Sequence, residues 1–195
     1  MYKISKQGNR KLGNVININI PPMVACRADL QCRKYCYCNK GTFLYPNVKN
    51  RYNENYNSYL VDGWLKTAYS IVDQIEKSNI ELVRWHASGE IVDSNYFKMV
   101  VSVAESLPQN RFMIFTKKYN IVNEWIDNNK LLPVNLTVVF SQDENVILEN
   151  KHNLPIAIVS DETTTCGSQL NNLTCANCKK CWNVSSGQTV IFKKH

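Results

Sequence analysis

Strand-like stretches that alternate with helical segments are the feature that most limits what this chain can fold into. Alternating or β-branched apolar residues predict strands over residues 14–20, 81–88, 111–117, 136–143, 155–161 and 189–194. Apolar residues at helical spacing predict helices over residues 64–77, 94–106 and 121–129. Residues 45–59, rich in Tyr and Asn, are expected to be irregular. Strands separated by helices join through right-handed crossovers, so we expect an α/β fold with parallel strands.

The alternation within the strands adds a prediction about curvature. In the second strand Arg84, His86 and Ser88 fall on one face, which makes that face of the sheet polar. A parallel sheet covered by helices on both sides is apolar on both faces. A polar face therefore favours a partial (β/α) barrel with a polar lumen, and an open sheet with one solvated face is the alternative. We expect the barrel over residues 1–161 and a cysteine-rich, metal-binding tail over 162–195 that packs on the same domain.

Composition narrows the class of protein. Hydrophobic residues are 44% and charged residues 20% of the chain, as in globular proteins, and no run of 18 apolar residues predicts a membrane span. The basic N-terminus has no apolar segment behind it, so we expect no signal peptide and a reducing, cytoplasmic location. There, eight cysteines favour metal ligands or catalytic thiols over disulfides. The net charge of +7 allows a nucleic-acid partner, but the basic residues look scattered and no binding motif supports one.

The segment CRADLQCRKYCYC, residues 26–38, concentrates four cysteines directly after the first predicted strand. In (β/α) barrels the loops at the carboxyl ends of the strands carry the chemistry. Cys26, Cys32 and Cys36 can bind three irons of a [4Fe–4S] cluster, which leaves the fourth iron open to a substrate or cofactor. Cys38 is either a fourth ligand, which would close the site, or a bystander.

A second group of cysteines lies in the tail, at Cys166, Cys175, Cys178 and Cys181. Three cysteines at two-residue gaps, with one distant partner, match the start of a ferredoxin-type cluster sequence. A structural zinc site more often takes its ligands as two separated pairs. We therefore expect a closed [4Fe–4S] cluster here, with zinc as the alternative, and either would close the tail around metal.

Taken in order along the chain, these motifs resemble the radical S-adenosylmethionine enzymes. Those enzymes carry a three-cysteine loop after the first strand of a partial (β/α) barrel, with an aromatic residue before the third cysteine, where Tyr35 stands here. Their usual spacing is C-x3-C-x2-C, whereas this chain has C-x5-C-x3-C. Ser88, Gly89 and Glu90 resemble the motif that holds the methionine amino group. The third and fourth strands end in FTK, residues 115–117, and in FSQD, residues 140–143 with Ser141, where the family places ribose and carboxylate contacts.

The resemblance extends to a small, cysteine-rich branch of such proteins encoded by phages. In that branch a Cys-Tyr pair, a Trp-His-x-Ser-Gly-acid stretch and a cysteine-rich tail ending in His follow one another. This chain has Cys36-Tyr37, then WHASGE at residues 85–90, and a terminal His195. The resemblance therefore implies a viral protein that works in the host cytoplasm.

The resemblance also implies a reaction. An electron donor would reduce the open cluster, and S-adenosylmethionine would be cleaved to a deoxyadenosyl radical. The radical would attack an unknown substrate in the lumen near Arg84 and His86, the expected catalytic residues. The residues themselves leave two other functions open: a non-catalytic iron–sulfur protein in electron transfer or an accessory role, or a zinc-stabilised nucleic-acid-binding protein. His86 also suits a structural role, and Ser88–Glu90 a plain strand-to-helix turn.

Overall fold

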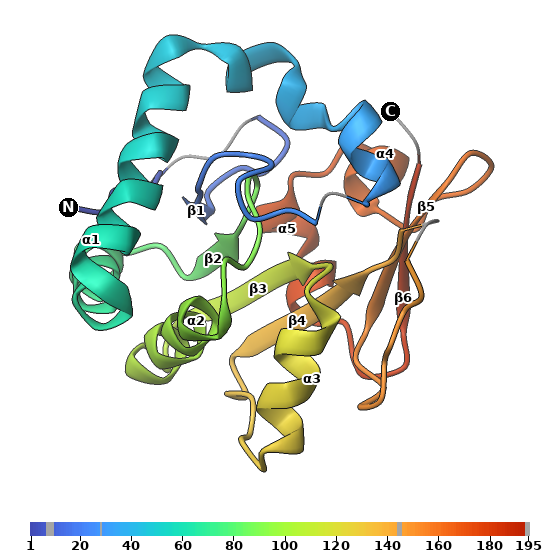
Figure 1. Cartoon of the computed structure of the whole chain (residues 1–195). Helices are drawn as coiled ribbons and strands as arrows, with labels where there is room; N and C mark the ends of the chain where they lie inside the picture. The colour runs from blue at the N-terminus through green and yellow to red at the C-terminus, as the bar shows by residue number, and fades with distance from the viewer. Residues whose placement is uncertain (7–9, 28, 144–145, 194–195) are drawn as a thin grey trace.

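Six parallel strands form one sheet, and their order in space follows their order in the chain (Figure 1). The computed structural model describes residues 1–6, 10–27, 29–143 and 146–193, so His195 lies outside the described residues. The strands are β1 Ile16–Ile18, β2 Leu82–Trp85, β3 Arg111–Thr116, β4 Leu136–Ser141, β5 Ile156–Ser160 and β6 Thr189–Lys193. Each lies within a predicted strand, which confirms the α/β fold with parallel strands. The sheet is not closed.

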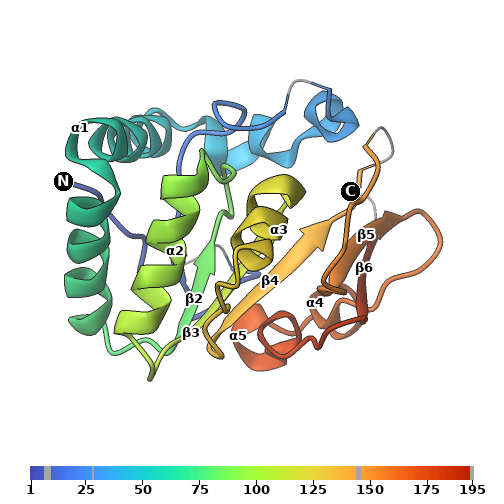
Figure 2. The same ribbon diagram turned by 60° about the horizontal axis from the view of Figure 1, so that its bottom comes forward.

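Helices connect the strands and cover the sheet. The α-helices are α1 Pro46–Glu76, α2 Ser94–Ser106, α3 Tyr119–Asp127, α4 Gly167–Asn171 and α5 Cys175–Cys178. The 3-10 helices are η1 Gln31–Tyr35, η2 Tyr37–Asn39, η3 Gly41–Leu44 and η4 Lys180–Trp182. Figure 2 shows α1, α2 and α3 together on one face of the sheet. In the part of the chain that the structure describes, no helix is long and apolar enough to cross a membrane.

The main core lies between the sheet and α1–α3. Asp93 begins α2, because its carboxylate accepts a hydrogen bond from the Tyr96 N–H at 2.8 Å. The helical spacing of the following apolar residues then buries Phe97 and Val100 against Trp85 of the sheet. The sequence predictions of α2 and α3 are therefore confirmed, within two residues at each end.

Helix α1 begins much earlier than the sequence pattern indicates. Residues 45–59 were predicted to be irregular, but the helix starts at Pro46, whose fixed φ suits a first turn, and bends at Gly63 with φ 74°. Tertiary contacts hold this first half in place. Asn55 is buried and donates a hydrogen bond to the Asn19 carbonyl at 2.9 Å. Such contacts override the weak helix propensity of Tyr and Asn, so the prediction of an irregular segment is wrong.

The opposite face of the sheet is covered by the tail. Met113 and Leu82 pack there against Trp182 of η4, and a neighbouring apolar cluster forms around Val139. Arg84 points to the same side, with its guanidinium carbon 5.7 Å from the centroid of the Phe115 ring. The tail therefore occupies a face that the alternation predicts as an open polar lumen.

His86 does not share the face of Arg84, so that part of the sequence prediction is wrong. β2 ends at Trp85, and His86 has φ 59°, a left-handed conformation that breaks the alternation of the strand. The His86 ring stacks on Tyr96 of α2 with centroids 5.5 Å apart, and its Nε2 lies 3.1 Å from the Tyr96 hydroxyl. Ala87 packs on the tail side instead.

Candidate functional site

The loop that carries the first cysteine group lies over the carboxyl ends of the strands (Figure 2). Contacts with the segments after β2 and β4 hold it there. The Asp143 carboxylate accepts hydrogen bonds from the N–H groups of Gln31 at 3.0 Å and Cys32 at 3.1 Å. The Tyr37 hydroxyl donates to the Ala87 carbonyl at 2.5 Å. The loop thus lies at the edge where parallel α/β proteins place their ligands.

Cys26, Cys32 and Cys36 are half-buried, and their charges act on one another. Burial raises the pKa of Cys26, and the Glu90 carboxylate nearby raises it further. Burial also raises the pKa of Cys32 to about 11, against the opposing charge of Lys117. Because a thiol must lose its proton to bind metal, binding here would release protons. The loop brings the three predicted ligands within electrostatic reach of one another.

Cys38 differs from the other cysteines of the loop because it is buried. It is 5% exposed, and its thiol lies 3.7 Å from the Ala87 carbonyl, to which it can donate. A hydrogen bond between the two thiols lowers the pKa of Cys36 and raises that of Cys38. Cys38 is therefore directed toward the end of β2. Tyr35, at the end of η1, is exposed beside Cys36.

The turn formed by Ser88 and Gly89 docks onto the end of β1. The Ser88 N–H donates to Asn19 Oδ1 at 3.0 Å, and the Ser88 hydroxyl donates to the Ile20 carbonyl at 3.1 Å. Gly89 has φ 103°, and a Cβ there would lie 2.4 Å from Cγ1 of Ile20 and 3.0 Å from its carbonyl oxygen. Only glycine fits this conformation and this close approach. The turn therefore lies at the same edge of the sheet as the cysteine loop.

Glu90 ties the ends of β2 and β3 together. Its carboxylate is 6% exposed and accepts three hydrogen bonds, from the Ile91 N–H at 2.8 Å, the Thr116 hydroxyl at 2.7 Å and the Lys117 N–H at 2.9 Å. Burial raises the pKa of Glu90, and the hydrogen bonds oppose this rise. With both carboxylate oxygens engaged, Glu90 holds the turn in position.

Lys117, the last residue of the FTK segment at the end of the third strand, is a charged residue of this edge. Its ammonium donates to the Ser141 hydroxyl at 3.0 Å, and its charge reaches Cys32 and Cys36. The Tyr119 hydroxyl donates to the Ser141 carbonyl at 2.5 Å. Lys117 lies at the end of the third predicted strand, and Ser141 lies near the end of the fourth. Together they present an ammonium and a hydroxyl beside the cysteine loop.

The four tail cysteines also gather in one place. Cys166 precedes α4 and is 8% exposed. A Cβ on Gly167 would lie 2.7 Å from the Cys178 sulfur, so this thiol packs on the backbone next to Cys166. Burial raises the pKa of Cys175 and raises that of Cys181 to about 12, and the charges of other tail thiols add to both. The structure therefore groups the four predicted tail ligands.

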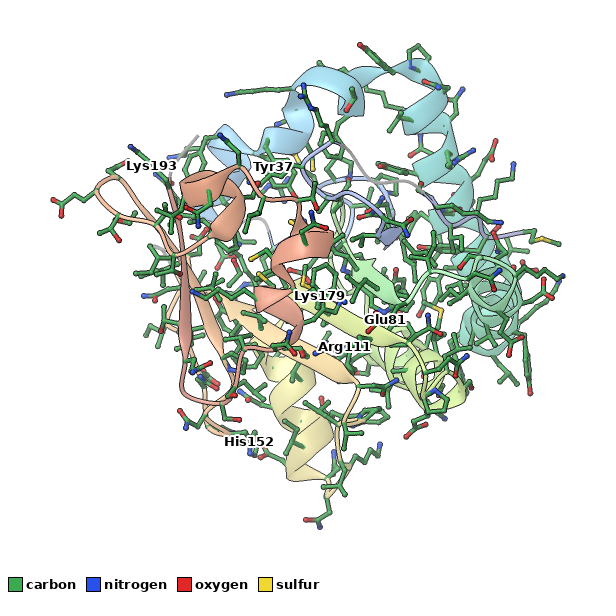
Figure 3. All side chains as sticks on the ribbon, turned by 180° about the vertical axis from the view of Figure 1, so that it is seen from behind. Tyr37, Glu81, Arg111, His152, Lys179 and Lys193 are labelled. Atoms are coloured by element: carbon green, nitrogen blue, oxygen red, sulfur yellow. The ribbon has the colours of Figure 1, made fainter. Side chains whose placement is uncertain are left out.

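Hydrogen bonds and an ion pair fix the tail to the sheet. The Trp182 indole N–H donates to the Val83 carbonyl at 3.0 Å, and the Trp182 carbonyl accepts from the Arg111 guanidinium at 3.2 Å. Lys179 pairs with Glu81 at 3.4 Å (Figure 3). These contacts join the cysteine-rich segment to β2 and β3 across 71 to 99 residues of the sequence.

Arg84 lies within electrostatic reach of the tail cysteines and of Tyr37 in the loop. Its charge opposes the burial effect on the pKa of Tyr37 in the loop and on the pKa values of Cys175 and Cys181 in the tail. Its Nε is buried and has no hydrogen-bond partner among the described residues. A buried guanidinium nitrogen without a partner is costly, so this position suits a negative group that the arginine would contact.

The spacing of the thiols bears on which kind of metal site each cysteine group suits. Within residues 1–6, 10–27, 29–143 and 146–193, no three His, Cys, Asp or Glu side chains lie close enough to hold one metal ion. Four thiolates on one zinc, at 2.3 Å each, lie about 3.8 Å apart. In a cubane each thiolate binds a different iron, so the sulfurs lie farther apart. The donors of each group are thiols beside a lysine or an arginine, and thiolates are the ligand type that iron–sulfur clusters take.

The fold and these groups describe an α/β protein whose cysteines gather at the carboxyl ends of the strands and on one face of the sheet. The chain belongs to the Gene product 88 family, whose model matches residues 3–180. That match includes the whole cysteine loop and ends one residue before Cys181. No curated protein and no solved structure matches the chain. The family description names no activity.

Proposed function

We propose that this chain is an iron–sulfur protein that binds two [4Fe–4S] clusters and acts on S-adenosylmethionine. In the loop the cluster ligands are Cys26, Cys32 and Cys36. In the tail they are Cys166, Cys175, Cys178 and Cys181. One observation carries the proposal: a three-thiol loop lies beside the Ser88–Gly89 turn and the Lys117–Ser141 pair, all at the carboxyl ends of the strands.

The arrangement of the strands supports the finer description of the fold as a partial (β/α) barrel. Six parallel strands follow one another in chain order, and α1–α3 lie together on one face. Successive right-handed crossovers between neighbouring strands put the helices on the same side, as in a barrel that has not closed. In such a fold the loop after β1 is a ligand-binding loop.

The residues around the loop have separable tasks. When bound, a cluster with one open iron would supply an electron to a sulfonium cofactor. The ammonium of Lys117 and the hydroxyl of Ser141 would bind the cofactor's carboxylate. The polar backbone of Ser88 and Gly89 would face its amino group. Glu90 acts as a positioning residue, since its carboxylate is already engaged by three hydrogen bonds.

The remaining predicted residues take other parts in this proposal. Tyr35 would shield the third ligand of the loop from solvent. Arg84 would offset the negative charge of the tail cluster, whose four thiolates leave no iron open, and it remains the candidate for contact with an anionic substrate. His86, buried against Tyr96, would support the packing of α2. The reaction would also need an external electron donor.

The test is cofactor binding and cleavage by reduced, cluster-replete protein. We expect the wild-type protein to bind S-adenosylmethionine in calorimetry and to release 5′-deoxyadenosine slowly. Lys117→Met should weaken binding about ten-fold, because a charge-assisted hydrogen bond contributes about 1.5–3 kcal/mol. Lys118→Met, one residue further on, is the matched control and should bind as the wild type does. No binding at millimolar cofactor, together with no deoxyadenosine, would overturn the catalytic proposal.

A second function is favoured by the contact between Cys36 and Cys38. If Cys38 turned from Ala87 toward the loop, it would supply a fourth thiolate and close the site. The chain would then be a non-catalytic iron–sulfur protein in electron transfer. Cys38→Ala separates the two functions: unchanged iron content supports the open cluster, and loss of the loop's iron supports the closed one.

A further inference from the structure

The positive charge of the chain is concentrated in residues 30–53, here called the basic rim. This segment holds five of the 23 basic residues and none of the 16 acidic ones, so the rest of the chain carries 18 basic residues against 16 acidic. The five are Arg33, Lys34, Lys40, Lys49 and Arg51. The description of scattered basic residues therefore holds for the rest of the chain but not for this segment.

The basic rim is exposed along the carboxyl ends of the strands. It spans η1, η2, η3 and the start of α1, which Figure 2 shows above the sheet. Four of its cations are exposed, at Lys34, Lys40, Lys49 and Arg51. None of the four joins a salt bridge between described residues, whereas Lys66 pairs with an acid on the same helix α1. These cations are therefore available to an anionic partner.

Aromatic rings stand between the cations of the basic rim. Tyr35, Tyr37 and Tyr45 are all exposed, and Tyr45 is 55% exposed. The rings of Tyr37 and Phe43 meet edge to face with centroids 5.6 Å apart, which holds the Tyr37 ring in place. Exposed aromatic faces interleaved with lysine and arginine are the surface on which unpaired bases stack while phosphates contact the cations.

We propose that the basic rim binds single-stranded nucleic acid. The phosphates would contact Lys40, Lys49 and Arg51, and bases would stack on Tyr45 and its neighbours. An anionic membrane fits less well, because the rim interleaves its rings with polar asparagines, and among its described residues Leu44 is the one exposed large aliphatic side chain. An acidic protein would use the cations but not the stacking rings. The proposal does not depend on the cluster, since none of these contacts uses a cysteine.

The first test compares nucleic acids on the anaerobically purified protein. Fluorescence anisotropy would measure binding of a labelled oligonucleotide of about 16 nucleotides as single-stranded RNA, as single-stranded DNA and as a DNA duplex. We expect tighter binding to at least one single strand than to the duplex, with affinity that falls as salt rises. The proposal would be overturned if the protein bound the single strands, the duplex and heparin with equal affinity. Binding only to anionic phospholipid vesicles or to an acidic peptide would overturn it as well.

The second test locates the contacts with two variants of equal charge. Lys40→Gln/Lys49→Gln/Arg51→Gln should weaken single-strand binding about 100-fold at about 0.1 M salt and lower the salt slope by about 2. The control, Lys77→Gln/Lys130→Gln/Lys151→Gln, removes three cations outside the rim and should bind within a few-fold of the wild type. Equal losses in both variants would mean that net charge alone attracts the strand, which would contradict the proposal.

The third test isolates stacking. Tyr45→Leu keeps an apolar side chain and removes the ring, and it should weaken binding roughly five-fold or more without changing the salt slope. Tyr69→Leu, an exposed tyrosine of α1 beyond the rim, should have no effect. Iron content measured on every variant shows whether the loop is intact, so failure of nucleic-acid binding is distinguishable from failure of the cluster proposal. If Tyr45→Leu, Tyr35→Leu and Tyr37→Leu each bound the single strand as the wild type does, the stacking argument would be contradicted.

Discussion

The two cysteine groups are embedded in the protein in different ways. The loop group lies over the ends of the strands in short 3-10 turns, and it is held by hydrogen bonds that it donates to the Asp143 carboxylate and to the Ala87 carbonyl. The tail group lies against one face of the sheet, where Cys175 and Cys181 adjoin the apolar cluster around Trp182. A polar support can adjust when its ligand changes, whereas a site built into a packed core cannot. The difference suggests a tail that maintains the fold and a loop that carries the chemistry.

The largest expected effect is a difference in thermal stability between variants of the two cysteine groups. Cys181→Ala should remove the tail cluster and uncover the sheet face, and a loss of about 4 kcal/mol would lower Tm by about 8–16 °C. Cys32→Ala should remove the loop cluster and lower Tm much less, because the core between sheet and helices is untouched. Thermal unfolding followed by circular dichroism checks both variants, with Cys38→Ala as control. Equal shifts for Cys181→Ala and Cys32→Ala would erase the contrast between the groups.

The next effect concerns the glycine beside Cys166. Gly167→Ala places a methyl group within 2.7 Å of the Cys178 sulfur. A free thiol would rotate away, and the substitution would then stabilise the chain by about 0.4–1 kcal/mol through the unfolded state. A thiolate fixed to a cluster cannot rotate, so we expect loss of the tail's iron and retention of the loop's. Iron analysis with thermal unfolding decides the sign, and a stabilised variant with full iron would contradict the ligand role of Cys178.

A smaller effect tests the polar support of the loop through pH. Burial raises the pKa of Glu90 above its value of 4.5, so its contribution to stability is full below that value and is lost as pH rises through the folded-state pKa. Glu90→Gln removes one hydrogen-bond acceptor and should cost about 1–3 kcal/mol at low pH, with a cost that shrinks as pH rises. Glu105→Gln, on the exposed side of α2, is the control for the same substitution. Urea unfolding across pH measures both, and a constant cost for Glu90→Gln would contradict the account.

The smallest effect concerns His86, which the sequence placed with Arg84. Burial is the main cause that lowers the pKa of His86 to about 3, and the positive charge of Arg84 is the second cause. Its contribution to stability is therefore present above the ordinary histidine pKa and is lost as pH falls toward the lowered one. The ring signals of His86 in NMR should not move between about pH 5 and pH 8. A titration of His86 near its ordinary pKa would restore it as a candidate acid or base.

The elements of the fold could be predicted wherever local periodicity decides the structure. The strands and helices α2 and α3 follow the alternation and helical spacing of apolar residues, and Asp93 marks the start of α2. The first half of α1 could not be predicted this way, because distant partners such as Asn19 hold it in place. The left-handed conformation of His86 could not be predicted either, because the alternation of residue types does not show where a strand ends.

The cysteines of the candidate sites could be predicted from the sequence, but the residues that surround them could not. The spacing of the cysteines predicted the two groups, and in the structure the charges of their members act on one another. The covering of one sheet face by the tail depends on contacts such as Trp182 with Val83, far apart in the sequence, which no local pattern encodes. The basic rim, by contrast, is visible in the sequence as a long stretch without acidic residues. The description of the basic residues as scattered missed it.

The most direct test of the central claim is the content of iron, sulfide and zinc in anaerobically purified protein. Two cubane clusters predict about eight irons and eight sulfides per chain in the wild type and in Cys38→Ala. Cys32→Ala and Cys181→Ala should each retain about four of both. Protein that carries stoichiometric zinc and no iron, in the wild type and the variants alike, would contradict the account.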